Sequence, residues 1–425
     1  MNIWLIFLRK VNDWIKNIKS EIKPHDIPWL FLFFVLPVFP SLISSSIVLI
    51  IISLLLRYKS CIFNFSENKL LLLPLILYLS YMIGLLFTES EGMKAIVAER
   101  KLSLLIFPLI FLFKVNFEPS FRKWLWGSFS MGLMLYVILS FFGSIQLYSS
   151  SKDINSFFSS AFSYELHPSY SALYLSVAIL YFLHHLTSFY NQSSTKHKLS
   201  IFIIVLIFSF TVFLLSSKAG IISLFLVYLL SFLNFANKKK KLKYVMLLLL
   251  LAVIFLPVLY FLNPVPLQRF KNMFEASSIP REQLFKDHHA STESNVVRRM
   301  IWTVSCEIIR DNPFGVGSGD ANAELLKKYQ QYEMDGALSK ELNAHNQFLQ
   351  TTLALGFPGL LLLLAFFIAP LAYSVRNKNF LMFVFVVLVV LNLSVESMLE
   401  TESGIVFICL FYPFLLLETK KNREI

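Results

Sequence analysis

Ionisable side chains stand at the ends of several long apolar runs, where taking a charge out of water is costly and a function is the default explanation. These residues are Arg100, Lys101, His167, Lys218, Arg298 and His345. Arginine binds phosphate oxygens through its planar fork, and lysine supplies a point charge. A neutral histidine can accept a proton from a hydroxyl group. These residue types therefore predict a site for an anionic ligand with a base beside it.

Each of these residues also has a plainer explanation that the sequence leaves open. The long side chains of Arg100 and Lys101 can reach toward the membrane surface or pair with neighbours. Lys218 can serve as an interface anchor, and His345 can belong to a polar cluster that caps a helix. Two acidic residues near the end of the chain, Glu396 and Glu400, either hold a cation in place or hydrate a turn.

Composition shows what kind of chain must position these residues. Of 425 residues, 56% are apolar and only 15% are charged, against about 45–50% and about 25% in a soluble domain. The mean hydropathy is +0.65. These values exclude a soluble globular protein, a disordered chain and a disulfide scaffold. The three cysteines, Cys61, Cys306 and Cys409, are too far apart for a zinc site, and no metal or cofactor is expected.

Apolar runs separated by charged breaks predict about twelve membrane-spanning helices of about 20 residues each. The candidate spans are 28–40, 41–56, 70–88, 95–113, 124–146, 167–188, 200–215, 219–236, 244–262, 346–374, 380–395 and 403–418. The fold class is therefore all-α, a polytopic transmembrane helical bundle.

Positive charge alternates from one connection to the next. One set of loops is basic, with KKKKLK at 238–243 as the strongest run, and the other set is acidic or neutral. Because cytoplasmic loops carry the excess of Lys and Arg, both termini are predicted in the cytoplasm. The net charge of +12 is thus explained by topology rather than by nucleic-acid binding.

One outer connection, residues 263–345, is long, polar and nearly balanced in charge. The stretch beginning at Ser294 has apolar residues at a helical period, with Ser294 as the expected cap. The glycines of NPFGVGSGD (312–320) then stop this helix, and Asp320 is expected to cap a second one. We expect a small helical subdomain that lies on the membrane.

Four motifs in this region carry a family resemblance. They are RRMIW at 298–302, NPFGVGSG at 312–319, HNQFLQ at 345–350 and GFPGLL at 356–361. Two weaker segments are ERKLSLLIFPLIF at 99–111 and SSKAGIISLFL at 216–226. In order and spacing the chain resembles the O-antigen ligase family, which shares its fold with the O-antigen polymerases. Family members often carry Arg where this chain has Lys218, which keeps the charge but loses the bidentate fork.

The resemblance implies a metal-independent, inverting glycosyltransferase at the periplasmic face of the bacterial inner membrane. The implied donor is a glycan on undecaprenyl pyrophosphate, and the implied acceptor is a sugar hydroxyl of the lipid A core. The predicted parts are a cytoplasmic amphipathic N-terminus 1–27, spans one to nine 28–262, a periplasmic subdomain 263–345, spans ten to twelve 346–418 and a cytoplasmic tail 419–425.

The resemblance also suggests roles for individual residues. His345 would activate or orient the acceptor hydroxyl, and Arg298 would contact the pyrophosphate while Trp302 packs their shared helix. Arg298 and Trp302 are four residues apart and could stack. The substrate-binding candidates are Lys218, Arg100, Lys101, Arg299, His167, Asn346 and Trp302. Among these, Arg299 is the weaker choice, because it points about 100° away from Arg298 on a helix.

Three other functions remain open at this stage. A polysaccharide polymerase would use a second lipid-linked glycan as acceptor, and a protein O-oligosaccharyltransferase would use a protein hydroxyl. A polytopic transporter is disfavoured, because transporters often show two related halves and midplane charges, whereas these charges gather at one face. The sequence does not predict an oligomeric state.

Overall fold

The computed structural model of the chain describes residues 22–56, 69–112, 117–189, 193–235, 265–287, 291 and 293–417. Over these ranges the secondary structure is helical and contains no strand, which confirms the predicted all-α fold. The N-terminal segment, the candidate span at 244–262 and the C-terminal tail lie outside the described residues.

All the candidate spans within the described ranges coincide with helices, and all of these except α5 are apolar. The helices are α2 (Ile27–Val35), α3 (Ile43–Leu55), α4 (Leu72–Gly84), α5 (Glu91–Lys101), α6 (Ser103–Leu112), α7 (Pro119–Ser151), α9 (Pro168–Ser188), α10 (Thr195–Leu214), α11 (Lys218–Phe235), α18 (Gln347–Arg376), α19 (Phe380–Leu393) and α20 (Glu402–Leu416). Five helical stretches are long and apolar enough to cross a membrane by themselves, and α3, α11, α19 and α20 are shorter apolar helices. The chain is therefore a helical membrane protein, while the count of about twelve spans stays a prediction.

The fourth candidate span differs from the prediction because it is two helices. α5 ends at Lys101 and α6 begins at Ser103, with a tight turn in which the Leu102 N–H donates to the Glu99 carbonyl at 3.0 Å. The Lys101 side chain is only 1% exposed. A continuous helix that faces lipid would not need such a break. We therefore attribute the break to the contacts of the buried Lys101 side chain.

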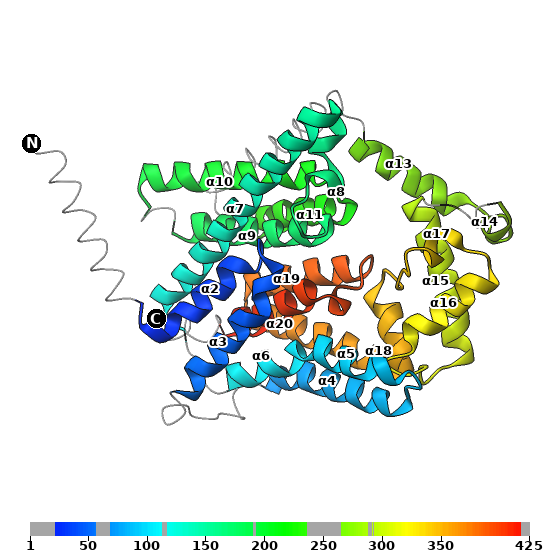
Figure 1. Cartoon of the computed structure of the whole chain (residues 1–425). Helices are drawn as coiled ribbons and strands as arrows, with labels where there is room; N and C mark the ends of the chain where they lie inside the picture. The colour runs from blue at the N-terminus through cyan, green and yellow to red at the C-terminus, as the bar shows by residue number, and fades with distance from the viewer. Residues whose placement is uncertain are drawn as a thin grey trace, which may run out of the picture.

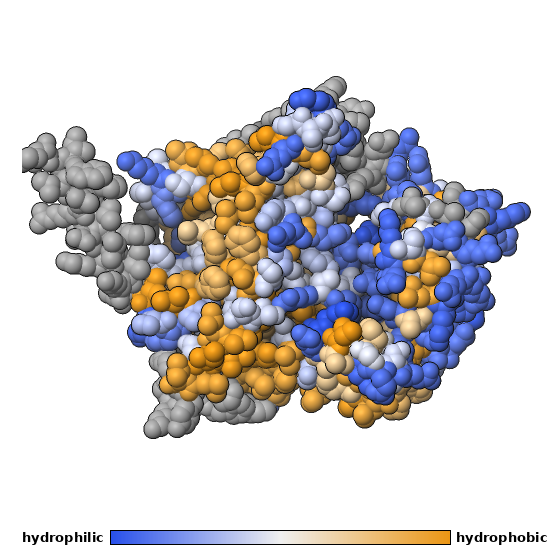
Figure 2. Space-filling view, viewed as in Figure 1, coloured by the Kyte–Doolittle hydropathy of each residue, from blue (hydrophilic) through white to orange (hydrophobic). Residues whose placement is uncertain are grey.

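The predicted outer segment folds as a separate group of helices. They are α13 (Val265–Ser278), α14 (Arg281–Asp287), α15 (Ser294–Asp311), α16 (Ala321–Gln331) and α17 (Asp335–Leu338). Figure 1 shows this group at one end of the molecule, beside α18 and away from α2. Figure 2 shows a hydrophilic surface over that end and a hydrophobic band over the apolar helices.

Two expected helix caps are wrong. The residue that caps α15 is Glu293 rather than Ser294, and its carboxylate accepts from the N–H groups of Asn295 and Val296. Asp320 stands directly before α16, but its side chain makes no cap. It accepts instead from the N–H groups of Glu89 and Ser90, at 2.7 and 3.1 Å, and so ties the outer subdomain to the segment between α4 and α5.

The core of the bundle is aromatic and centres on α9 and α20, whose residues are mostly buried. Tyr174 of α9 stacks on Phe407 of α20 with ring centroids 4.1 Å apart. Phe407 also contacts Phe411, which packs on Trp126 of α7. The Tyr174 hydroxyl donates to the Ser403 carbonyl at 2.7 Å, so this core fixes the start of α20 against α9.

Helix α18 breaks at Gly356, whose φ is +65° and ψ is −164°. A break in a membrane helix leaves carbonyl groups without partners, and these must be satisfied by nearby protein. The 312–320 loop supplies the donors: Val316 N–H donates to the Leu353 carbonyl at 2.8 Å and Gly317 N–H to the Ala354 carbonyl at 3.2 Å. The predicted end of α15 before this glycine-rich loop is thereby confirmed.

Candidate functional site

The carboxylate of Glu396 lies where the outer subdomain meets the bundle, just after α19. Arg298 of α15 donates to its Oε1 through Nη2 at 2.7 Å. The Nδ1 of His345, which lies just before α18, is 3.1 Å from its Oε2. Only 4% of Glu396 is exposed. One buried carboxylate thus holds the two residues that the sequence ranked first.

The contact between Glu396 and His345 fixes which ring nitrogen of His345 carries a proton. Burial by itself would raise the pKa of Glu396, but the hydrogen bond from His345 and the positive charge of Arg298 outweigh it and lower that pKa to about 2. An ionised carboxylate only accepts hydrogen bonds, so the proton at this contact belongs to His345 Nδ1. When the imidazole carries only this one proton, its Nε2 keeps a lone pair, which is the arrangement that a general base requires.

The backbone around His345 is fixed by its neighbours. His345 has a φ of +44°, and its N–H donates to the Asn343 side chain at 2.9 Å. Asn346 caps α18 by accepting from the N–H groups of Phe348 and Leu349, and its own N–H donates to Ser397 Oγ at 3.2 Å. Asn346 therefore positions His345 through the backbone.

Trp302 fastens α15 to this same segment. Its indole N–H donates to the Ala344 carbonyl at 3.0 Å. Arg298 does not stack on Trp302 as expected. Among the described residues, the cation–ring contacts are those of Lys101 with Tyr81 and of Lys152 with Tyr148. Trp302 thus packs the helix that carries Arg298, as the family resemblance implied.

The starts of α9 and α11 complete this side of the site. Ser169 Oγ lies 3.5 Å from Glu396 Oε1 and 3.1 Å from Ser217 Oγ. His167 caps α9, and its charge contributes to the low pKa of Glu396. Lys218, the first residue of α11, donates to the Asn295 side chain of α15. Helix N-termini carry partial positive charge, so both helix starts add to a field that favours anions.

A second buried carboxylate, Glu400, collects the cations of α5. Lys101 Nζ lies 2.6 Å from Glu400 Oε1, and Arg100 Nη1 lies 3.9 Å from Oε2. Gln347 of α18 donates to the same carboxylate at 3.1 Å and accepts from the Leu399 N–H at 2.8 Å. Burial raises the pKa of Glu400, but the charge of Lys101 and its hydrogen bond outweigh it and lower that pKa.

These contacts explain the break between α5 and α6. The buried Lys101 is committed to Glu400, to the Leu399 carbonyl at 2.8 Å and to the face of Tyr81 at 4.5 Å. Arg100 keeps about a third of its side chain exposed. The structure thus separates a structural cation, Lys101, from an accessible one, Arg100.

The predicted residues therefore fall into two groups around two carboxylates. Arg298, His345 and His167 lie around Glu396, and Arg100 and Lys101 lie around Glu400. Lys218 directly follows Ser217, whose hydroxyl contacts Ser169 beside Glu396. Arg299 lies in neither group. It donates to the carbonyls of Ala276 and Ile279, at 2.5 and 2.7 Å, and so holds the end of α13.

Of the two alternatives that the sequence left open for Glu396 and Glu400, the structure shows that both carboxylates hold cations. The sequence did not single out Gln347 or Ser169, which contact these carboxylates. The one available signal was the position of two carboxylates, four residues apart, beside apolar spans, where charges are expensive. Within the described ranges, no three His, Cys, Asp or Glu side chains gather closely enough to bind a metal ion.

Comparison with known proteins supports the family resemblance. Residues 203–364 match the family model described as O-antigen ligase. The matched segment contains Lys218, Arg298 and His345, and it ends before Glu396. A search of the curated proteins finds no match for the chain. The predicted resemblance to the O-antigen ligase and polymerase family is thereby confirmed for this segment of a helical membrane protein.

Proposed function

We propose that the protein is a glycosyltransferase of the O-antigen ligase type, which moves a glycan from undecaprenyl pyrophosphate to a sugar hydroxyl of the lipid A core. The observation that carries the proposal is the contact of Glu396 with both Arg298 and His345. An imidazole and a guanidinium that share one carboxylate support a general base beside a cation, the pair that we propose for transfer from a pyrophosphate.

The transfer proceeds as one displacement. The acceptor hydroxyl gives its proton to His345 Nε2 while its oxygen attacks the anomeric carbon of the donor sugar. The bond from that carbon to the pyrophosphate oxygen breaks, and undecaprenyl pyrophosphate leaves with the bonding electrons. Attack opposite to the leaving group inverts the anomeric configuration. The ionised Glu396 stabilises the positive charge that forms on His345.

The leaving pyrophosphate needs positive charge held in place before the reaction begins. Arg298, Lys218 and the exposed Arg100 supply it, and the N-termini of α9 and α11 add their partial charges. A guanidinium group has five N–H donors. Among the described residues, Arg298 uses Nη2 for Glu396, so its other N–H donors can serve a ligand.

The predicted topology gives this site its place in the cell. With both termini in the cytoplasm, the α13–α17 subdomain and the site beneath it face the periplasm of a Gram-negative inner membrane. A lipid-linked donor then reaches the site from the outer leaflet.

Transfer by the purified full-length protein tests the proposal. The assay supplies an undecaprenyl-pyrophosphate glycan, with or without lipid A core, to wild type, Arg298→Ala and His345→Ala. Matched controls are Arg281→Ala, an exposed arginine on α14, and His197→Ala, an exposed histidine on α10. We expect glycan on the core with wild type and both controls, and no transfer with either site variant.

Other outcomes separate the competing functions. A lengthened lipid-linked ladder that needs no core would identify a polymerase that uses the same site. Transfer only to an added protein acceptor would identify a protein O-oligosaccharyltransferase. If the donor serves a control enzyme and no acceptor is glycosylated, the ligase proposal is refuted.

A further inference from the structure

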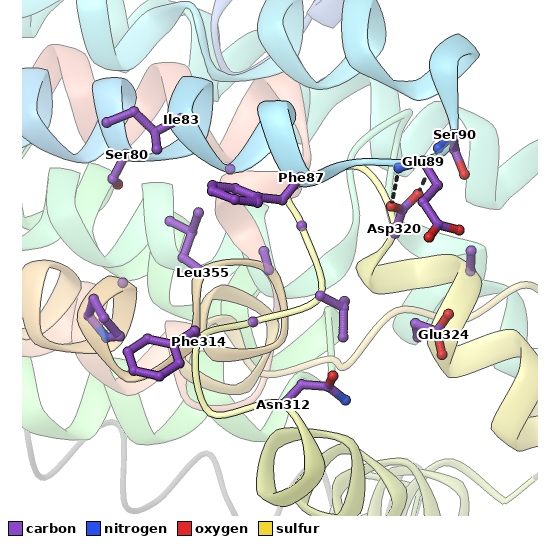
Figure 3. A pocket seen from close by; sticks show the side chains of 18 of the residues that line it. Ser80, Ile83, Phe87, Glu89, Ser90, Asn312, Phe314, Asp320, Glu324 and Leu355 are labelled. Atoms are coloured by element: carbon purple, nitrogen blue, oxygen red, sulfur yellow. Dashed lines mark hydrogen bonds between the residues drawn. The ribbon is translucent and has the colours of Figure 1, made fainter.

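A cavity of about 660 Å³ lies outside the site just described, and none of the residues around Glu396 and Glu400 lines it. Its walls are the end of α4 and the segment after it, the loop 312–320, the start of α16 and the broken part of α18. Figure 3 shows that its lining is divided: Ile83, Phe87, Phe314 and Leu355 lie toward one end, and Glu89, Asp320 and Glu324 toward the other.

The apolar end of this cavity lies between α18 and the helical stretch Lys69–Phe87 that contains α4, and both are long and apolar enough to span a membrane. Large apolar side chains around it are uncovered by protein: Phe87 is 72% exposed and Phe314 82% exposed. Exposed apolar surface of this extent marks a contact with lipid or a partner. Because the apolar end lies between two candidate spans, its natural occupant is an acyl chain.

The polar end carries an excess of negative charge. Three carboxylates line it, those of Glu89, Asp320 and Glu324, together with one ammonium group, that of Lys327. Lys327 Nζ lies 2.5 Å from Glu324 Oε1. Burial raises the pKa of Asp320, but hydrogen bonds from Ser90 and Glu89 outweigh it and lower that pKa, so Asp320 stays charged at neutral pH.

This polar end is separate from the cationic site and opposite to it in sign. Ser90 and Arg100 lie at the two ends of α5. Ten residues at 1.5 Å per residue put them about 15 Å apart. A pyrophosphate drawn to Arg100 and Arg298 would be repelled by Glu89 and Asp320, so the cavity does not extend the donor site.

We propose that this cavity binds a phospholipid whose headgroup carries an ammonium group. Its acyl chain lies between α4 and α18, its phosphate lies toward Lys327, and its ammonium group pairs with Glu89 and Glu324. A lipid with a net negative headgroup and no cation cannot form an ion pair with these carboxylates, and they repel its charge. The lining thus selects a zwitterionic headgroup by charge complementarity.

Native mass spectrometry of the full-length protein in detergent tests the proposal. The probes are phosphatidylethanolamine and phosphatidylglycerol with the same acyl chains, added in equal amounts. We expect phosphatidylethanolamine to be retained about fivefold more than phosphatidylglycerol, and the Glu89→Gln/Glu324→Gln variant to lose that preference. The control Glu282→Gln changes an exposed carboxylate on α14 and should keep it.

A second variant tests the place of the acyl chain. Ser80 lines the apolar end of the cavity, so Ser80→Phe should reduce the retention of both lipids together. Equal retention of the two lipids by the wild-type protein would overturn the proposal. A preference that persists in the double glutamate variant, or preferential capture of an uncharged glycolipid added as a third probe, would overturn it as well.

Discussion

Replacement of Glu396 by glutamine tests the proposed catalytic arrangement most directly, because it keeps the shape of the side chain and removes one acceptor. In the protein, one carboxylate oxygen accepts from Arg298 and the other contacts His345 Nδ1. A glutamine amide has one oxygen and one NH₂ group. If the oxygen serves Arg298, the NH₂ group faces His345 and favours the tautomer in which Nε2 carries the proton and cannot act as base. If the oxygen serves His345, Arg298 faces a donor.

Both arrangements weaken general-base catalysis by His345 and so raise the activation barrier. A general base contributes about 10²–10⁴-fold to a rate, so kcat for glycan transfer should fall by about 10²-fold or more in Glu396→Gln. The matched control is Glu402→Gln, a carboxylate six residues away that accepts from Ser44, and its kcat should stay within about twofold of wild type.

The same substitution has a calculable effect on stability. The pKa of Glu396 is lowered from 4.5 to about 2, which corresponds to about 3 kcal/mol of folding free energy. Because the folded-state pKa is the lower one, this stabilisation is present above pH 4.5 and is lost as the pH falls toward 2. Glu396→Gln should therefore lower the melting temperature at pH 7 and flatten its dependence on pH between 5 and 3.

Transfer is measured well below the melting temperature of the variant, so that loss of activity is not loss of fold. His345→Ala provides the comparison, and the double variant with Glu396→Gln should be no slower than His345→Ala alone, because residues that act as one unit are not additive. A Glu396→Gln protein that melts early but transfers glycan at the wild-type rate would refute the assigned tautomer, and Glu396 would then be a structural carboxylate only.

Three further predictions concern the surroundings of the site. Lys218→Arg should lower the KM for the lipid-linked donor, because arginine adds a bidentate fork, and Lys218→Ala should raise it about tenfold or more, because alanine removes the charge. Equal KM values for the two variants would contradict a role of Lys218 in donor binding. Lys101→Met should reduce the free energy of unfolding by about 3–5 kcal/mol, because it removes the buried ion pair between Lys101 and Glu400. An unchanged thermal transition would show that this ion pair is dispensable. Gly356→Ala should lower the melting temperature, because its β-carbon would lie 2.3 Å from a loop carbonyl oxygen, whereas Gly92→Ala, with open space around it, should leave the melting temperature unchanged.

Hydropathy located the helices well because a span is specified locally, by its length and its apolar composition. The fourth candidate span shows the limit of that reasoning. Hydropathy predicts one helix at 95–113, but the chain turns at Leu102. The reason is the contact of Lys101 with Glu400, almost 300 residues later in the sequence, and no local pattern reveals such a pairing.

The candidate site divides in the same way. His345 and Arg298 could be singled out from their residue types and their place at the ends of apolar runs. Glu396 also stands beside an apolar run, but its partners could not be predicted, because they lie 51 and 98 positions away in the chain. Arg299 shows that helical geometry predicts the direction of a side chain but not the groups that it contacts. It was expected to point away from Arg298, and its partners, the carbonyls at the end of α13, could not be foreseen.

The glycines of the 312–320 loop explain how such distant residues are held in register. Gly315 has no room for a β-carbon, which would lie 2.6 Å from the Gly356 backbone nitrogen, so the loop can enter the break of α18 only with glycine there. The loop ends α15, and the helix it enters begins just after His345. α15 and α18 are therefore fastened together at this loop.

The same two helices are fastened again at the carboxylate of Glu396, through Arg298 on α15 and His345 before α18. Between the two fastenings, α15 runs about 20 Å and α18 about 15 Å, at 1.5 Å per residue. Two rigid elements joined at both ends cannot slide past one another without breaking one of the joints. The outer subdomain thus keeps the base and the cation at a fixed separation, and it does so with backbone hydrogen bonds far from the reacting groups.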